Sequence, residues 1–274
     1  MLKYLHLLFL LLPFSVWGYS PEDVSSFTEN YGYIAVRQMI DYDIPASIIL
    51  AQAFLESKHG TSQLAKENNN FFGIKAKSDW DGPYVVMRSA EYKHHRRFVK
   101  KSRFRKYDFP EESWRDHSEF LANSRRYNRL FEKGLFNYRG WARGLQRAGY
   151  ATDPKYASKL IHLIERHHLN DFDKVAFRIA HHIPINLEAV HPANRQALRA
   201  LQSIFEQVAQ NTTQKELLAE SAQQEKEMAE SIQFDTNRTP EPAATKFYVY
   251  LSEETKPIIR QVDRSKIDHF EYKK

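Results

Sequence analysis

Glu56 is the residue whose surroundings point most directly to chemistry. It follows the stretch Ile48–Leu55, which is apolar apart from one glutamine. A carboxyl group beside Phe54 and Leu55 is partly removed from water, and desolvation raises its pKa. A carboxyl that stays protonated near neutral pH is what a general acid requires. Gln52 lies one helical turn earlier on the same face. The alternative is a solvated carboxylate at the end of an amphipathic helix.

Adjacent histidines raise the question of a metal site. They occur as three pairs, His94-His95, His167-His168 and His181-His182. Neighbours in sequence point in different directions on a helix, and no His-Glu-x-x-His pattern is present. A phosphate-cradling glycine loop is also absent from the sequence. We therefore expect no metal site and no cofactor.

The composition limits the chemistry and the partners further. The sequence of 274 residues has no cysteine, which excludes disulfides, a thiol nucleophile and a thiolate metal site. Hydrophobic residues make up 42% of it, enough to build a real core. The formal net charge of +6 favours an anionic polymer as partner. A soluble protein with a basic surface would have the same charge.

The first residues have the form of a secretory signal peptide. Lys3 gives a positive start, Leu5–Phe14 is largely apolar, and Gly18 is a small residue at the expected cleavage point. The apolar run is short for a membrane span. We expect residues 1–18 to be removed and the mature protein to be exported to the periplasm, the cell envelope or the exterior. An uncleaved anchor is the alternative.

Apolar spacing and turn residues predict the elements that position these groups. One helix is expected to begin at Pro21, and a second runs from Pro45 to a stop at Gly60. The segment Trp80–Arg105 predicts a β-hairpin lobe. Further helical patterns cover Glu111–Leu121, Tyr138–Ala148 and Pro154–His168. The chain should divide into a compact domain over residues 19–183 and an extension over residues 184–274.

The extension itself has two parts. Leu198, Leu201, Phe205 and Val208 form an apolar stripe at helical spacing. Thr239–Pro242 then breaks the chain before a short tail. We expect the extension to be a helix followed by a linker and a tail. The helix is either packed on the domain or on a protein partner, or it is a solvated spacer.

Several motifs follow one another in order between residues 25 and 173: Ala51–Ser57, Asn69–Lys75, Ala90–Tyr92, Phe104–Tyr107, Ser113–Phe120, Tyr138–Gln146 and Ala148–Ala157. Together they resemble glycoside hydrolase family 73. These are lysozyme-like endo-β-N-acetylglucosaminidases and include the glucosaminidase part of flagellar rod-assembly proteins. The resemblance implies a mainly α (α+β), lysozyme-like domain. A small β-hairpin lobe would flank the catalytic cleft.

The resemblance also assigns roles to three residues. It implies Glu56 as the general acid, Glu91 as a second carboxylate on the β-lobe, and Tyr150 as a tyrosine of the site. Glu91 would activate water in an inverting reaction. Alternatively, the 2-acetamido group of the substrate attacks and Tyr150 orients it. An exposed hairpin acid and a buried structural tyrosine are the simpler interpretations of Glu91 and Tyr150.

A further set of residues is expected to bind substrate: Gln52, Asn69, Asn70, Phe71, Phe72, Tyr92, Tyr127 and Asp153. Phe71 and Phe72 match the aromatic groove of the family, but they could be entirely core; we expect one to pack inward and the other to line the groove. Asn69 and Asn70 could equally be turn residues. The sequence departs from the family pattern at Lys58-His59. It also departs in the β-lobe, which is rich in arginine and lysine.

The function implied by the resemblance is that of an exported peptidoglycan hydrolase. It would cleave the β-1,4 bond between N-acetylglucosamine and N-acetylmuramic acid, with the glycan strands as its partner. Export argues against nucleic acid, and no stable membrane insertion is expected after signal cleavage. One alternative is a non-catalytic wall-binding or scaffolding protein on the same fold. Another is a lytic transglycosylase or muramidase, although the Gly-Leu-Met-Gln type of stretch is missing.

Overall fold

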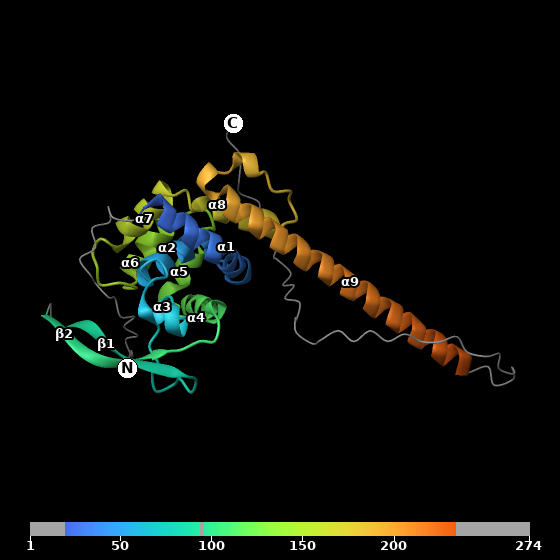
Figure 1. Cartoon of the computed structure of the whole chain (residues 1–274), viewed down its shortest axis with the longest axis horizontal. Coiled ribbons are helices and arrows are strands. Elements are labelled where there is room, and N and C mark those ends of the chain that lie inside the picture. The colour runs from blue at the N-terminus through green and yellow to red at the C-terminus, as the bar shows by residue number, and fades with distance from the viewer. Residues whose placement is uncertain (1–19, 94–95, 234–274) are drawn as a thin grey trace. The chain divides into compact units, whose positions relative to one another are not determined.

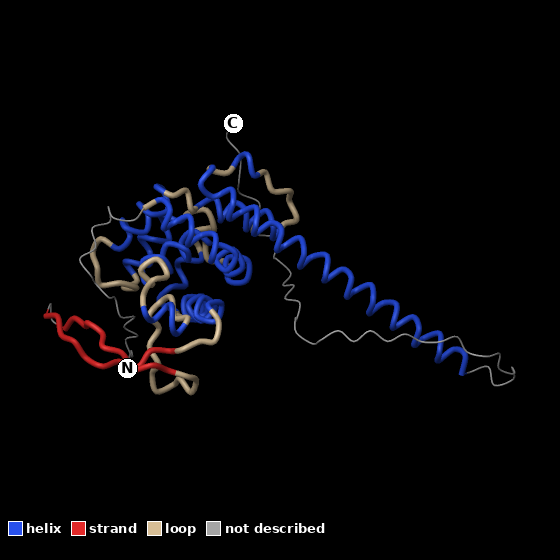
Figure 2. The backbone as a smooth tube through the Cα atoms, viewed as in Figure 1, coloured by secondary structure: helices blue, strands red, loops and turns tan. Residues whose placement is uncertain are grey.

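The computed structural model of the protein describes residues 20–93 and 96–233. The expected signal peptide, and the linker and tail after residue 233, lie outside the described residues. The described part is mainly helical, with one two-stranded sheet (Figure 2). The prediction of a mainly helical domain with a small β-hairpin lobe is therefore confirmed.

The helices of the described residues are, in chain order, α1 (Pro21–Tyr42), α2 (Ala46–Glu56), α3 (Gln63–Asn68), α4 (Pro110–Asn123), α5 (Asn128–Phe131), α6 (Tyr138–Arg147), α7 (Tyr156–Arg166), α8 (Asn170–Ala180) and α9 (Arg195–Gln233). Short 3-10 turns lie between them: η1 (Arg125–Tyr127), η2 (Leu187–Ala189) and η3 (Pro192–Asn194). The helices expected from Pro21 and Pro45 are present as α1 and α2. The later patterns correspond to α4, α6 and α7.

Helix α1 begins where its sequence predicts. The Ser20 hydroxyl accepts a hydrogen bond from the backbone N–H of Asp23, and the Asp23 carboxylate accepts one from the N–H of Ser20. This reciprocal pair satisfies two backbone donors that a helix start otherwise leaves unpaired. Pro21 occupies the first turn, where its missing N–H costs nothing. The helix ends at Asp43, which has a left-handed backbone with φ of 56°.

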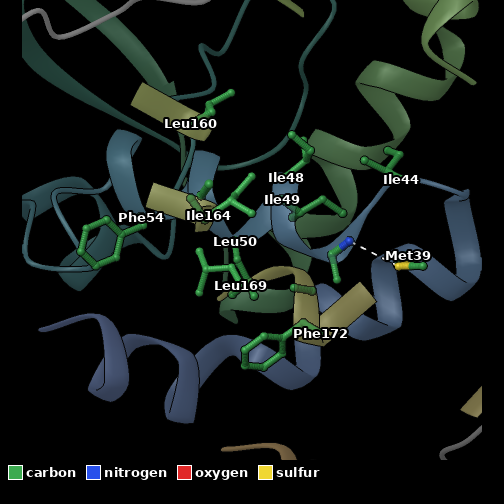
Figure 3. Close-up of a cluster of buried hydrophobic side chains, with 14 of the residues drawn as sticks. Met39, Ile44, Ile48, Ile49, Leu50, Phe54, Leu160, Ile164, Leu169 and Phe172 are labelled. Carbon is green, nitrogen blue, oxygen red and sulfur yellow. Dashed lines mark hydrogen bonds between the residues drawn. The ribbon is translucent and has the colours of Figure 1, made fainter. Parts of the chain in front are cut away.

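Helix α2 is the centre of the domain. Nine of its eleven residues, from Ala46 to Phe54, are buried. It packs against α1, α6, α7 and α8, and Figure 1 shows these helices gathered around it. In Figure 3, Ile48 and Ile49 of α2 lie close to Leu160 and Ile164 of α7 within one apolar cluster. A helix that is apolar on every side has to be enclosed in this way.

The β-hairpin consists of β1 (Tyr84–Lys93) and β2 (Arg96–Arg105), paired antiparallel. Side chains alternate between the two faces of the strands. Ser89, Ser102 and Phe104 are buried on one face, and the two serine hydroxyls are hydrogen bonded at 2.8 Å. The Arg105 guanidinium contacts both carboxylate oxygens of Asp116 on α4, at 2.7 and 2.8 Å. This ion pair ties the base of the hairpin to the helical part.

Three helices were not predicted: α3, α5 and α8. Helix α5 has only four residues. Helix α3 has six residues, too few for an apolar period to be recognised. Helix α8 follows α7 after a break at His168, whose φ is +53°. Phe172, Val175 and Ala176 of α8 are buried in the core. No glycine or proline lies between α7 and α8, so the sequence has no conventional turn signal to separate a second helix from the first.

The compact unit extends further along the chain than the expected boundary at 183. The first unit ends at Phe205, and the second begins at Glu206. Val190, Leu198 and Leu201 are buried in the core of the first unit. Leu198 and Leu201 of the apolar stripe therefore belong to the fold of this domain, whereas Val208 is 49% exposed and lies in the second unit. Across the described residues, no helix combines the length and the apolar character needed to cross a membrane.

Burial of the first turns of α9 predicts a difference between two leucines of the same helix. Leu198 is fully buried, whereas Leu218 is 52% exposed. Leu198→Ala should lower the free energy of unfolding by about 2–5 kcal/mol, because it leaves a cavity in the core. Leu218→Ala is the matched control and should change it by less than about 0.5 kcal/mol. Denaturant unfolding of both variants measures this, and equal effects would contradict the packing described.

Candidate active site

The carboxyl group of Glu56 lies at the last residue of the buried helix α2. The residue as a whole is partly exposed, but its Oε1 atom is shielded from solvent and has no hydrogen-bond partner among the described residues. Burial raises the pKa of Glu56 from 4.5 to about 8, and the charge of Lys159 opposes this shift only in part. The negative end of the helix dipole acts in the same direction as burial. At neutral pH this carboxyl is largely protonated.

The chain reverses direction immediately after Glu56. Lys58, His59 and Gly60 all have left-handed backbones, with φ of 52°, 47° and 79°. The N–H of His59 donates to the carbonyl of Phe54, and the N–H of Gly60 donates to the Ser57 hydroxyl. Left-handed geometry is costly for residues other than glycine. The departure from the family pattern at Lys58-His59 thus falls on strained positions beside the candidate acid.

Two buried tyrosines lie next to Glu56. The rings of Tyr150 and Tyr156 are stacked, with centroids 5.6 Å apart. Burial raises the pKa of both phenols well above 10, and the charge of Glu56 contributes to both shifts. Gln52 donates from Nε2 to the Tyr156 hydroxyl at 3.0 Å, while its own Oε1 is buried without a partner among the described residues. Gln52, Glu56 and Tyr150 are therefore brought together as expected.

A turn with a left-handed glycine positions Tyr150 at the end of α6. Gly149 has φ of +69°, and the N–H of Tyr150 donates to the carbonyl of Leu145 at 3.0 Å. A Cβ atom on Gly149 would lie 2.9 Å from Nη2 of Arg126. The Arg126 guanidinium in turn donates to the carbonyls of Ala148 and Gly149. Only glycine fits both the backbone angle and this close contact.

His117 of α4 is part of the site, although the sequence analysis did not single it out. Its Nε2 is hydrogen bonded to the Tyr150 hydroxyl at 3.1 Å, and Phe72 stacks on its ring at 4.0 Å. Burial lowers the pKa of His117 to about 3, so the imidazole is neutral. The available signal was its helical spacing from Trp114 and Leu121, which are also buried.

Lys159 is a second residue that was missed. Its ammonium lies 2.7 Å from Oδ2 of Asp153, and its charge reaches Glu56. Burial alone would raise the pKa of Asp153, but hydrogen bonds from Lys159 and from the backbone N–H of Lys155 lower it overall. Asp153 is thus a paired carboxylate that holds the one cation acting on Glu56 in the described part of the chain.

The opposite end of α2 is held by another buried carboxylate. Asp173 of α8 accepts from the backbone N–H of Ser47 at 2.7 Å and from its hydroxyl at 2.6 Å. The N-cap residue of α2 is Pro45, whose side chain makes no capping hydrogen bond. Asp173 therefore supplies the cap from a distant helix. Burial raises the pKa of Asp173 to about 7 despite these two bonds.

The remaining expected substrate-binding residues fall into structural positions. Phe71 and Phe72 are both buried, and each ring contacts Trp114. Tyr127 is also buried, with its ring 6.3 Å from that of Tyr150. Asn69 donates to the carbonyls of Tyr107 and Asp108, and Asn70 bonds to Ile74 and Arg105. This placement agrees with the alternative interpretations, core for the phenylalanines and turn residues for the asparagines.

Glu91 and Tyr92 lie on β1. The register pairs Glu91 with Phe98 and Tyr92 with Arg97. Their side chains lie outside the described part of the structure. Their roles stay predictions.

The described site combines a proton donor with a shielded environment. Glu56 carries a proton at neutral pH, its Oε1 has no partner among the described residues, and its charge would act on the buried phenols of Tyr150 and Tyr156. Such a group can protonate an oxygen atom that leaves a carbon centre. This is the chemistry of a general acid in the cleavage of an acetal or glycosidic bond.

Comparison with known proteins gives a family match. The family model for glucosaminidase, described as mannosyl-glycoprotein endo-beta-N-acetylglucosaminidase, matches residues 32–169. Glu56, Glu91, His117, Tyr150 and Lys159 all lie within these limits.

Relatives of two kinds match just under half of the chain. The exo-glucosaminidase LytG of Bacillus subtilis is 38% identical over 139 residues, which cover 49% of this chain and 48% of LytG. The peptidoglycan hydrolase FlgJ of Vibrio cholerae is 37% identical over 121 residues, or 43% of this chain and 36% of FlgJ. The chain thus spans about half or less of the length of these relatives.

Solved structures are similar over the same part of the chain. The catalytic domain of the autolysin Auto from Listeria monocytogenes is 31% identical with a TM-score of 0.49, covering 57% of this chain and 90% of that domain. The glycoside hydrolase domain of FlgJ from Salmonella typhimurium is 28% identical with a TM-score of 0.44, covering 58% and 94%.

The raised pKa of Glu56 predicts a pH-dependent gain in stability for Glu56→Gln. Between pH 4.5 and about 8 the folded state holds a proton that the unfolded state releases. The stability of the wild type therefore falls as pH rises through this window, and the variant avoids that loss. Near pH 4 the two should melt alike. At pH 8 the variant should be more stable by up to about 4 kcal/mol, the value at this pH for the full shift of the Glu56 pKa.

Thermal or denaturant unfolding at both pH values measures this difference. Glu67→Gln, at an exposed position of α3, is the matched control and should show no such pH dependence. A Glu56→Gln curve parallel to the wild type at every pH would show that Glu56 is not desolvated.

Proposed function

Because the chain belongs to the glucosaminidase family of glycoside hydrolases, we propose that it is an exported peptidoglycan hydrolase. In this proposal it cleaves the β-1,4 bond between N-acetylglucosamine and N-acetylmuramic acid. The names of LytG and FlgJ support the reaction and the polymer. The signal-like sequence of residues 1–18 supports export to the cell envelope.

The observation that carries the proposal is the protonated carboxyl of Glu56. Cleavage of a glycosidic bond needs a proton on the leaving oxygen while positive charge develops at the sugar carbon. A pKa of about 8 keeps that proton available at neutral pH. The unpaired Oε1 supports a role in contacting an oxygen of the substrate, because buried polar atoms otherwise find a partner inside the protein.

The second half of the reaction is proposed to use Glu91 as the base that activates water. In an inverting pair the two carboxyl groups stand roughly 6.5–9.5 Å apart, and Glu91 is proposed as the partner of Glu56. The alternative is attack by the 2-acetamido group with Tyr150 as its guide. Tyr150 is 2% exposed and already bonded to His117. This burial favours the route through Glu91, with Tyr150 shaping the surroundings of Glu56.

The proposal also covers where the enzyme cuts along the strand and what the extension does. The matched family model is described as an endo-enzyme, whereas LytG is an exo-enzyme. We propose internal cleavage, which shortens long strands early in the reaction. For the extension after Phe205 we propose a role in localisation or in contact with a protein partner, since none of the proposed site residues lies beyond Lys159 in the chain.

The proposed role of Glu56 predicts which products the wild type releases and how strongly Glu56→Gln slows their release. Wild-type protein should release wall fragments with reducing N-acetylglucosamine ends, and Glu56→Gln should release them about 10²–10⁴-fold more slowly. Mass spectrometry of digested, purified peptidoglycan measures both. Glu67→Gln is again the matched control and should retain wild-type turnover.

Other outcomes would identify the rival functions. Reducing or anhydro-muramic ends would indicate a muramidase or a lytic transglycosylase. Absence of any cleavage by the folded wild type would indicate a wall-binding or scaffolding protein. Near-normal turnover by a folded Glu56→Gln would falsify the assignment of the acid.

The proposed base predicts chemical rescue. Glu91→Gln should lose about 10²–10⁴-fold in rate, and azide should restore part of the rate of Glu91→Ala by replacing the activated water. Steady-state rates with and without azide measure this. A mild effect of Glu91→Gln together with tight binding of a thiazoline-type inhibitor would instead support the acetamido route. A mild effect without such inhibition would contradict both.

A further inference from the structure

The excess positive charge of the chain is concentrated in the β-hairpin. Residues 84–105 contain eight lysines and arginines and one acidic residue, Glu91, which gives a net charge of +7. The whole chain has a net charge of +6. All other residues together therefore have a net charge of −1. The hairpin is therefore one of the most basic segments of the chain; residues 125–147, with seven lysines and arginines and one acidic residue, are a second.

One face of the hairpin presents part of this charge to solvent. The strand register places Val86 opposite Arg103, Arg88 opposite Lys101, and Ala90 opposite Val99. We call the exposed side chains of this side the outer face: Tyr84, Val86, Arg88, Val99, Lys101 and Arg103. The opposite face includes the buried Ser89, Ser102 and Phe104. Alternation along both strands thus separates an inner face from the outer face.

Within the described part of the chain, no carboxylate forms an ion pair with Arg88, Lys101 or Arg103. Arg103 lies over the ring of Tyr84, with its guanidinium carbon 5.2 Å from the ring centroid. Tyr84, Val86 and Val99 are 50–53% exposed. Cations and apolar groups therefore lie next to one another on this face of the hairpin.

The chemistry of this face indicates the kind of partner. Guanidinium and ammonium groups about 7 Å apart along a strand suit a series of carboxylates, and arginine binds carboxylates through paired hydrogen bonds. The exposed tyrosine and valines suit the aliphatic parts of sugars and amino acids. We propose that the outer face binds the peptide-stem carboxylates of peptidoglycan and holds the enzyme on the polymer. The identity of this partner rests on the proposed function.

The test uses the full chain with Glu56→Gln, so that the polymer stays intact during binding. Co-sedimentation with insoluble purified peptidoglycan gives the affinity at several salt concentrations. Adding Arg88→Gln, Lys101→Gln and Arg103→Gln should weaken binding about tenfold at low salt and flatten its salt dependence. Thermal melting should not change, because all three side chains are exposed.

A matched control removes the same charge elsewhere. Lys66→Gln, Arg129→Gln and Arg143→Gln alter three exposed cations of the helical part. This variant should bind like the parent, and an equal loss of affinity would show a general charge effect and overturn the proposal. Amidation of the stem carboxylates should abolish the difference between the parent and the hairpin variant. Persistence of the difference on amidated polymer would overturn it as well.

Two further measurements separate this inference from the proposed function. Without the Glu56 substitution, the hairpin variant should cleave soluble glycan strands that lack peptides at the wild-type rate. A folded wild type that cleaves no peptidoglycan would refute the proposed function, while the binding assay would still report on the outer face. Wild-type cleavage together with unchanged binding by the hairpin variant would refute the inference alone. Binding to anionic phospholipid vesicles is measured in parallel. If the three hairpin substitutions weakened binding to the vesicles but not to peptidoglycan, the outer face would be assigned to lipid headgroups and the inference would be refuted.

Discussion

The burial of α2 on every side is the constraint on which the rest of the domain depends. A helix with nine buried residues out of eleven can exist only inside a shell of other helices, and α1, α6, α7 and α8 provide it. Its two ends cannot rely on water. Asp173 caps the first turn from α8, and the left-handed turn after Ser57 closes the last one. Glu56 is carried at the point where the helix leaves the core.

The same burial acts differently on each ionisable group near this helix. It disfavours charge, so it raises the pKa of Glu56 and Asp173 and lowers that of His117. All three groups are therefore shifted toward their neutral forms near pH 7. Lys159, whose charge acts on Glu56, forms an ion pair with Asp153 at 2.7 Å. A neutral acid in a largely neutral setting is thus a consequence of packing, and no single strong interaction is needed to produce it.

The start of α9 and the hairpin surround this core. The first contributes to its stability, and the second is proposed to contact the polymer. The start of α9 contributes Leu198 and Leu201 to the core, so this part of the extension is structural. The hairpin is attached through Arg105 and Asp116 and carries the excess charge of the chain on a short two-stranded sheet. The shielded carboxyl group thus lies on α2, whereas the exposed cations of the outer face lie on the hairpin. The proposed function requires both, because the acid has to be desolvated while the proposed substrate is a large anionic solid.

The sequence alone determined the features that depend on neighbouring residues. The apolar run before Glu56, the helix start at Pro21, and the hairpin within Trp80–Arg105 are local patterns. Contacts between distant residues were decided by the tertiary structure: Gln52 and Tyr156 are 104 positions apart, and Ser47 and Asp173 are 126 apart. His117 and Lys159 became visible only once α4 and α7 were packed. The burial of Phe71 and Phe72 has the same origin, since whether an aromatic ring faces a groove or the core is set by what packs over it.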